Sequence, residues 1–554
     1  MFLLSTRLLP TIFSLNLHHK YNRPTMVSTQ RKQSEFNIFL LIFAFVCLIL
    51  FWTSRNSYTH DIFTNIDNAW YFTCGKSWML GLQPYLDFAD SKGPLLWLIY
   101  GIAYLISPQS YIGVFWLESL FSATTLFFMY KTAKCLSGKT CLSLAATLAS
   151  SLFLYNALHF ETKAEDFSLP FIAASLFVTV REFYGNRQRP ATAAFTVGLS
   201  IAACLLIKYS HAVMCAGFAV ALLVHNFSQT TGNRWKTPTA LICGFLLMAT
   251  PFAVYFIATG LWDNFIQEYF INTMRTVSLP PKETLSTYFL QELPLAFSFR
   301  KLTYTLVVLG LLVGSFLMSV RMPRHRWMLP ALVLWFVLLS LRHNITGHYI
   351  LIAAPFGIFL FLSVLQWLRL PQFRTGHIAL TAVVAAGIIV GLGQKPWKHP
   401  NFFTKNDSDR TVYYTVEAYM SQVEHPRLMT TVNLPMFDVI SEAVPASRYW
   451  ILQTGATGDM HQLRNDDIRR QTADFIICAD LPESCRPTPL MENSGYRLVY
   501  KDTIREVFRI PIPFYLYARN GLQLHEPKLP EISNSDIFFK RITRDKLLET
   551  KQEK

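Results

Sequence analysis

The residues best suited to chemistry gather in one stretch near the start of the chain. The segment NIDNAWYFTCGKSWMLGLQPYLDFADSKGPLLW, from Asn65 to Trp97, carries three aspartates and two lysines soon after an apolar run that begins at Phe36. An acid inside hydrocarbon costs roughly 2.5–3.5 kcal/mol on insertion scales, so these acids must lie in water, in a polar cavity or beside a cation. Asp67 is the strongest candidate for a functional carboxylate, whereas Asp87 is expected to be an ordinary solvated acid.

A second pair of acids, Glu165 and Asp166, stands at the beginning of a later apolar run. The helix macrodipole favours negative charge at this position by some tenths of a kcal/mol. Glu165 is therefore either a functional acid or a residue that only complements the helix dipole.

The elements that must position these acids are membrane helices. Hydrophobic residues make up 52% of the 554-residue chain, charged residues only 15% and aromatic residues 15%, which is typical of a polytopic membrane protein. The net charge of +15 could indicate nucleic-acid binding, but many of the basic residues lie in short loops between apolar runs. The positive-inside rule explains that placement, so no nucleic-acid partner is expected.

The basic residues also predict the topology. Lys20, Arg23, Arg31 and Lys32 precede the first span and place the N-terminus in the cytoplasm, with Asn65 and its neighbours outside. The run Pro94 to Ile106 is too short to span comfortably and is expected to form an interfacial or re-entrant helix. The run from Trp70 to Gly81 is also expected to lie at the interface. About eleven spans are expected in total. The first begins at Phe36, and the others lie near 111–130, 141–158, 167–180, 191–207, 211–227, 240–259, 302–320, 328–341, 349–368 and 378–392.

The expected organisation is an all-α membrane domain with a small C-terminal α/β domain. Residues 1–35 form a cytoplasmic segment, in which Met26 is an alternative start, 36–394 form the membrane domain and 395–554 lie outside. The tail combines a run of helical spacing with short β-rich runs between turn residues. It is expected to recognise an acceptor, to cover the outer cavity or to serve only as a structural cap. Cys478 and Cys485 both fall in this tail, where a disulfide between them is possible.

The first outer loop carries a family resemblance. Its pattern of Asp67, Gly81, the run PYLDFAD from Pro84 to Asp90, and KGPL from Lys92 to Leu95 resembles the bacterial protein O-mannosyltransferase and aminoarabinose-transferase-like group of membrane glycosyltransferases, which have the GT-C fold. Many members of that group carry Glu directly after the aspartate, where this chain has Asn68. Many also carry Pro-Pro after the lysine, where this chain has Gly93-Pro94.

The resemblance implies a sugar donor carried on a polyprenyl phosphate and an inverting displacement at the anomeric carbon. Asp67 would accept the proton of the acceptor hydroxyl, and Lys92 would stabilise the phosphate. Glu165 would be a second catalytic acid, while Tyr85 and Asp90 would position the loop. Lys208 and His348, at the outer ends of spans, would contact the phosphate or the donor. Lys92 and Lys208 could instead be snorkelling lysines at the ends of helices.

No cofactor is expected beyond the lipid-linked substrate. The sequence has no His and Cys cluster with metal-ligand spacing, although a divalent metal is not excluded, and it has neither a P-loop nor a dinucleotide fingerprint. The expected partners are the polyprenyl-phosphate sugar, membrane lipid and an extracytoplasmic acceptor that is a glycan, a lipid or a protein, in the inner membrane of a bacterium. The alternative functions are a transporter or an envelope-assembly scaffold. A transporter would require broken or charged mid-span segments and an internal repeat, which the sequence lacks.

Overall fold

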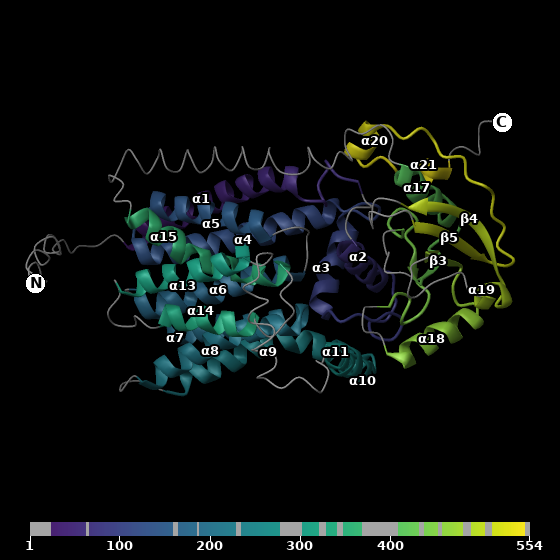
Figure 1. Ribbon diagram of the computed structural model, residues 1–554. Helices are drawn as coiled ribbons and strands as arrows, with labels where there is room; N and C mark the ends of the chain where they lie inside the picture. Colours follow the sequence, from purple (N-terminus) through teal and green to yellow (C-terminus); the bar gives the residue numbers. More distant parts are fainter. Residues whose placement is uncertain are drawn as a thin grey trace, which may run out of the picture.

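The protein consists of a long helical bundle joined at one end to a smaller domain that contains a β-sheet (Figure 1). The computed structural model describes residues 24–61, 66–158, 164–185, 188–228, 234–277, 302–320, 328–340, 347–367, 408–431, 437–452, 457–479, 489–504 and 512–548. The helices of the bundle are α1 (Pro24–Thr53), α4 (Ile112–Ser137), α5 (Thr140–Leu158), α6 (Ala164–Tyr184), α7 (Pro190–Ile207), α8 (Tyr209–Ser228), α9 (Lys236–Ala258), α13 (Leu302–Val320), α14 (Met328–Ser340) and α15 (Gly357–Trp367), the last preceded by the 3-10 helix η3 (Gly347–Phe356).

Six of the helices in the described part of the chain are long and apolar enough to cross a membrane. They are Gln33–Thr53 of α1, α4, α6, α7, α8 and α9. The expected spans near 302–320, 328–341 and 349–368 fall on α13, α14 and η3–α15, while 378–392 lies outside the described residues. The membrane character is confirmed, and the count of eleven stays a prediction.

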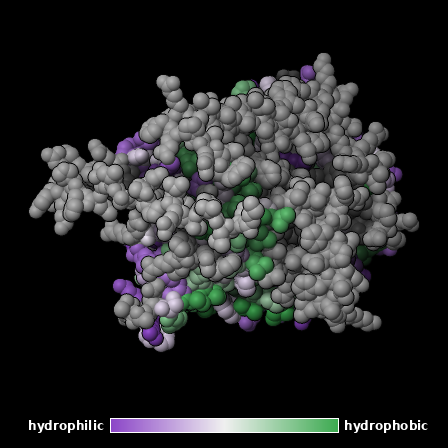
Figure 2. Space-filling view, turned by 60° about the vertical axis from the view of Figure 1, so that its left-hand side comes forward, coloured by the Kyte–Doolittle hydropathy of each residue, from purple (hydrophilic) through white to green (hydrophobic). Residues whose placement is uncertain are grey.

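The helices pack through small residues and face lipid with large apolar ones. Gly198 of α7 lies against the backbone of α9 at Leu241, and Gly244 of α9 lies against α7 at Phe195, so neither position has room for a Cβ atom. The outer faces of α8 and α9 expose Val220, Val224, Phe227, Ile242, Leu246, Leu247, Val254 and Ile257. Figure 2 shows hydrophobic side chains gathered over the lower part of the molecule, where these two helices lie in Figure 1.

Shorter helices lie between the bundle and the sheet (Figure 1): α2 (Ile66–Met79), α3 (Pro94–Ile106), α10 (Trp262–Phe265), the π-helix η1 (Ile266–Asn272) and α11 (Thr273–Val277). Helix α3 has 13 residues and begins with Pro94 after the extended Gly93, a favoured arrangement for a helix start. The expectation for α2 was wrong, because residues 68–77 are all buried rather than laid along a membrane surface. Its tryptophans and methionine instead pack in the core that α2 shares with α3 and the C-terminal domain.

The described part of the C-terminal region has a mixed five-stranded sheet in the order β2-β1-β3-β5-β4. Strand β1 is parallel to β2 and β3, and β5 is antiparallel to β3 and β4. Strand β3 is buried along its whole length. The strands are β1 (Arg427–Thr430), β2 (Val444–Pro445), β3 (Phe475–Ala479), β4 (Tyr496–Ile504) and β5 (Ile512–Arg519), and the helices are α17 (Ser408–Met420), α18 (Gly458–Arg469), α19 (Pro489–Asn493), α20 (Asn534–Phe538) and α21 (Arg544–Leu548).

Candidate active site

Charged residues from separate segments lie near enough to one buried phenol, that of Tyr71 on α2, to act on it electrostatically. Burial raises the pKa of Tyr71 well above its ordinary value, and the negative charges of Asp67, Asp90 and Glu165 raise it further. The ammonium of Lys92 lies 5.6 Å from the centre of the Tyr71 ring. The fold therefore brings together three of the acids and one of the lysines that were selected from the sequence.

The loop that carries Asp90 and Lys92, residues 83–93, has a constrained backbone; we call it the donor loop. Tyr85 is fully buried with a positive φ of 65°, and its hydroxyl donates to the carbonyl of Lys92 at 3.0 Å. The Gly93 N–H donates to the Ile207 carbonyl at 2.9 Å, and a Cβ atom on Gly93 would clash with the Leu206 carbonyl. A glycine after Lys92 thus lets the loop approach the end of α7.

An aromatic cage holds the Tyr85 ring. Its centre lies 4.6 Å from that of Trp97, 5.4 Å from Phe265 and 5.7 Å from Phe256. Such contacts contribute beyond simple burial. The positioning role assigned to Tyr85 from the sequence has this geometric basis.

A second cluster joins α6 to the α7–α8 junction. Glu165 is buried, and its Oε1 lies 2.6 Å from Lys208 Nζ and 3.3 Å from His211 Nε2. The other ring nitrogen of His211 lies 2.8 Å from the Ser168 hydroxyl. Lys208 has extended backbone between the two helices, which lets its side chain and that of His211 reach the same carboxylate. His211 was not selected from the sequence; its spacing of three from Lys208 was the available signal.

Asn68, which follows the proposed base, belongs to a buried polar network. Its side-chain oxygen accepts from the Tyr100 hydroxyl at 2.6 Å, and its amide donates to Asn56. Asn56 in turn donates to the buried carboxylate of Glu118 at 3.1 Å. A glutamate at position 68 would place a second buried acid beside Glu118, which is unfavourable unless one of them is neutralised. The amide fits this network.

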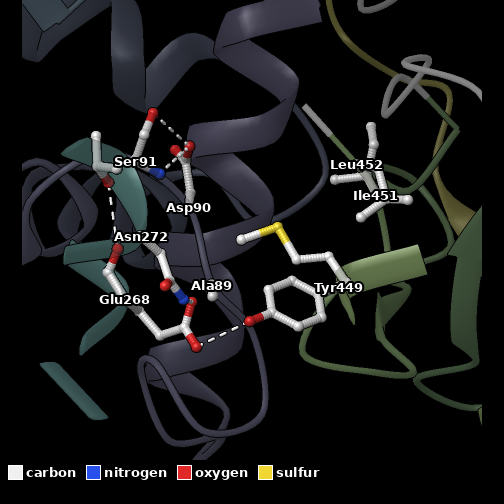
Figure 3. A pocket seen from close by; sticks show the side chains of 10 residues that line it. Ala89, Asp90, Ser91, Glu268, Asn272, Tyr449, Ile451 and Leu452 are labelled. Carbon is white, nitrogen blue, oxygen red and sulfur yellow. Dashed lines mark hydrogen bonds between the residues drawn. The ribbon is translucent and has the colours of Figure 1, made fainter. Parts of the chain in front are cut away.

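A pocket opens beside the donor loop, between the π-helix and the C-terminal domain. It encloses about 410 Å³ including solvent-facing space. Figure 3 shows Asp90 and Ser91 on one side, Glu268 receiving a hydrogen bond from Tyr449, and Ile451 and Leu452 on the C-terminal side. Glu268 was not selected from the sequence, because Arg448 and Tyr449, which bind its Oε1, lie about 180 positions further along the chain.

Some selected residues fall outside the side chains that the structure describes. His348 lies in η3, but its side chain is outside the described part. Cys478 is buried on β3, whereas Cys485 lies outside the described residues, so their disulfide stays a prediction. Within the described ranges, no group of three metal-ligating side chains occurs.

Comparisons with known proteins agree with this architecture. The model of the family described as dolichyl-phosphate-mannose-protein mannosyltransferase matches residues 91–262. The crystal structure of ArnT from Cupriavidus metallidurans in the apo state is similar at a TM-score of 0.55 and 11% identity, covering 88% of this chain and 98% of that one. The same protein bound to undecaprenyl phosphate gives a TM-score of 0.54 and 12% identity, with the same coverage.

A comparison with curated proteins by sequence found no match. At such low identity the structural similarity establishes the fold, and it confirms the GT-C architecture expected from the first outer loop. The family match covers the donor loop from Ser91 and extends through α3 to α9. Together, the family match and the shared fold identify the chain as a membrane glycosyltransferase with the GT-C fold.

Proposed function

We propose that the protein transfers a sugar from a polyprenyl-phosphate donor to an acceptor outside the cytoplasm, with inversion at the anomeric carbon. The observation that carries this proposal is the position of Lys92, 3.9 Å from Asp90 and 5.6 Å from the Tyr71 ring, where the charges of Asp67 and Glu165 also act. A lipid-linked donor presents its phosphate at the membrane surface, so a cation and a carboxylate are required at that depth. Undecaprenyl phosphate bound to the similar ArnT supports a donor of this class.

Asp67 is the proposed general base. The acceptor oxygen forms a bond to the anomeric carbon while the bond from that carbon to the phosphate oxygen breaks. The proton of the acceptor hydroxyl moves to Asp67, and the electron pair of the broken bond leaves with the lipid phosphate. Asp67 lies in the first turn of α2 and is only partly buried, as a group that meets a substrate must be.

Positive charge for the phosphate comes from the two lysines. Lys92 is the proposed direct partner, and its ammonium is 3.9 Å from Asp90 and 3.0 Å from the Ser91 hydroxyl. Lys208 is held by Glu165, so Glu165 acts by setting the position of this second cation. The leaving phosphate gains negative charge in the transition state. Positive charge that is already in place there lowers the activation barrier, because the protein does not have to reorganise.

The test is transfer by purified full-length protein in nanodiscs. Polyprenyl-phosphate sugars of different kinds are supplied with candidate glycan, lipid and peptide acceptors, and release of the lipid phosphate is measured. Mass spectrometry of envelope glycans and lipids from cells with and without the gene then identifies the product. Intact protein that binds no polyprenyl-phosphate sugar would contradict the proposal.

The proposed orientation places the site and the C-terminal domain outside the cytoplasm. A topology reporter fused after Lys139 is expected to be cytoplasmic, and one fused after Lys163 external. The reverse result would place the acids of the site on the wrong side for this reaction.

A further inference from the structure

The C-terminal domain contacts the donor loop through Arg448. The Ala89 N–H donates to the Arg448 carbonyl at 3.0 Å. The Arg448 side chain donates from Nε to the Leu86 carbonyl at 3.2 Å, and its Nη1 lies 3.3 Å from Glu268 Oε1. Arg448 thus joins three elements: its own domain, the donor loop and the π-helix.

The far end of this bridge is firmly anchored. Glu268 is buried, its Oε1 also accepts from the Tyr449 hydroxyl at 2.9 Å, and its Oε2 accepts from the Asn272 amide at 3.0 Å. Because several donors hold the Glu268 carboxylate, it can in turn fix the position of the Arg448 guanidinium. Hydrogen bonds between charged groups are stronger and more directional than those between neutral groups.

The contact falls at the part of the loop next to the proposed phosphate partner. Ala89 directly precedes Asp90, and Lys92 follows two residues later. On the other side, Tyr85 and Gly93 tie the loop to α3 and α7. The loop is therefore held from the membrane domain at both ends and from the C-terminal domain in its middle.

We propose that Arg448 is a positioning residue through which the C-terminal domain orders the donor loop and sets the place of Asp90 and Lys92. The C-terminal domain would then help to form the donor site in addition to covering it. The ordering of the loop follows from the contacts alone, whereas its consequence for lipid phosphate rests on the proposed function.

The domain has a second polar attachment to the membrane domain, away from Arg448. Arg410 Nε lies 3.0 Å from Asp61 Oδ2 after α1, and the Tyr414 hydroxyl donates to Asp61 Oδ1 at 2.9 Å. Arg410 is thus a second arginine that pairs with a carboxylate of the membrane domain, away from the donor loop. It provides a matched control for a general loss of docking.

The experiment compares Arg448→Met with Arg410→Met in the full-length protein. Methionine keeps an unbranched apolar stem and removes the donors. Hydrogen exchange of peptides covering residues 84–93 reports loop order, and titration with undecaprenyl phosphate reports binding. Arg448→Met is expected to speed exchange in these peptides and to weaken binding about five- to tenfold, as expected for the loss of hydrogen bonds involving charge. Arg410→Met should leave both readouts within about twofold, and Arg448→Lys should restore binding in part.

The outcomes separate the inference from the proposed function. If the wild type binds undecaprenyl phosphate and the two methionine variants behave alike, the inference is wrong. Faster exchange in Arg448→Met with unchanged affinity also overturns the positioning role. If the wild type binds no lipid phosphate but only Arg448→Met loosens the loop, the ordering stands and the proposed donor is wrong.

Discussion

Helix α2 carries two groups of polar residues that differ in their surroundings. Asp67 and Tyr71, four residues apart, share the face turned to the candidate site. Thr73 and Lys76 share another face, turned to the C-terminal domain. There they meet Asp438 and Glu417, and we call these four residues the latch.

Most polar groups of the latch bond within the protein, while the buried Asp438 Oδ1 has no hydrogen-bond partner within the described residues. Lys76 is fully buried, and its Nζ donates to the Asp438 carbonyl at 2.6 Å. The Thr73 hydroxyl donates to the Asp438 carboxylate. Glu417 accepts backbone N–H groups of Val439, Ile440 and Ser441 at 2.8–3.2 Å.

At the candidate site, the proposed base and the proposed phosphate partner stay within reach of solvent and substrate. The Lys92 side chain is 18% exposed, and Asp67 is only partly buried. On α2, burial alone therefore does not indicate a functional residue, whereas access to solvent and substrate does. Changes at the site should therefore act on activity, and changes in the latch should act on stability.

The largest effect is expected for Asp67→Asn, which keeps the shape of the side chain but cannot accept the proton. Turnover should fall by roughly two to four orders of magnitude, the usual contribution of a general base. Undecaprenyl phosphate binding and the thermal midpoint should stay close to wild type. The measurement is transfer from a polyprenyl-phosphate sugar, with binding followed separately, and near-normal transfer would remove Asp67 from the mechanism.

Lys76→Met should produce the next largest effect, on stability. Removing one partner of a buried charge group leaves Asp438 and Glu417 without their cation, which costs about 3–5 kcal/mol in comparable cases. Denaturant unfolding of the purified protein measures this loss. The control is Lys131→Met, since Lys131 pairs with Glu35 in a partly exposed contact at 2.7 Å and should change stability by about 0–1 kcal/mol. Equal effects of the two substitutions would remove the distinction drawn for the latch.

Lys92→Met should act on binding with little effect on stability. Loss of a charged donor to a phosphate weakens binding by about 1.5–3 kcal/mol, which is roughly tenfold or more in Kd. Titration with undecaprenyl phosphate tests this expectation. Lys139→Met serves as the control, because Lys139 is exposed between α4 and α5. This variant should bind undecaprenyl phosphate as tightly as the wild type. A destabilised variant with unchanged affinity would place Lys92 with the latch.

The sequence was sufficient to select acids that the fold brings near Tyr71, but not the contacts that join distant parts of the chain. Asp67, Glu165 and Lys208 stand out because charges at the ends of apolar runs require a reason. Arg448 and Glu268 meet from positions 180 residues apart, and no local periodicity encodes such a meeting. The same limit explains the expectation for α2: an amphipathic run next to a span predicts a membrane surface, whereas here another domain covers it.

The last expected effect is a pH dependence of the latch. Burial raises the pKa of the Asp438 carboxyl to about 7 from an ordinary value of 3.8, while Lys76 and the Thr73 hydroxyl oppose the rise. Between these two values the folded protein binds more protons at Asp438 than the unfolded chain does. This contribution to stability is therefore full below about pH 4 and is lost as the pH rises through 7, by at most about 1.4 kcal/mol per pH unit.

Asp438→Asn removes this titration, because an amide stays neutral over the whole range. Wild type should therefore lose stability relative to the variant as the pH rises from 5 to 8. Burial lowers the pKa of Lys76, which alone would add stability as the pH rises towards 10.5, but Lys76 is present in both proteins. Denaturant unfolding at pH 5, 6, 7 and 8 measures the difference between the two free energies of unfolding. A constant difference across this range would mean that Asp438 is ionised in the folded protein throughout, as it is in the unfolded chain, and would overturn the raised pKa.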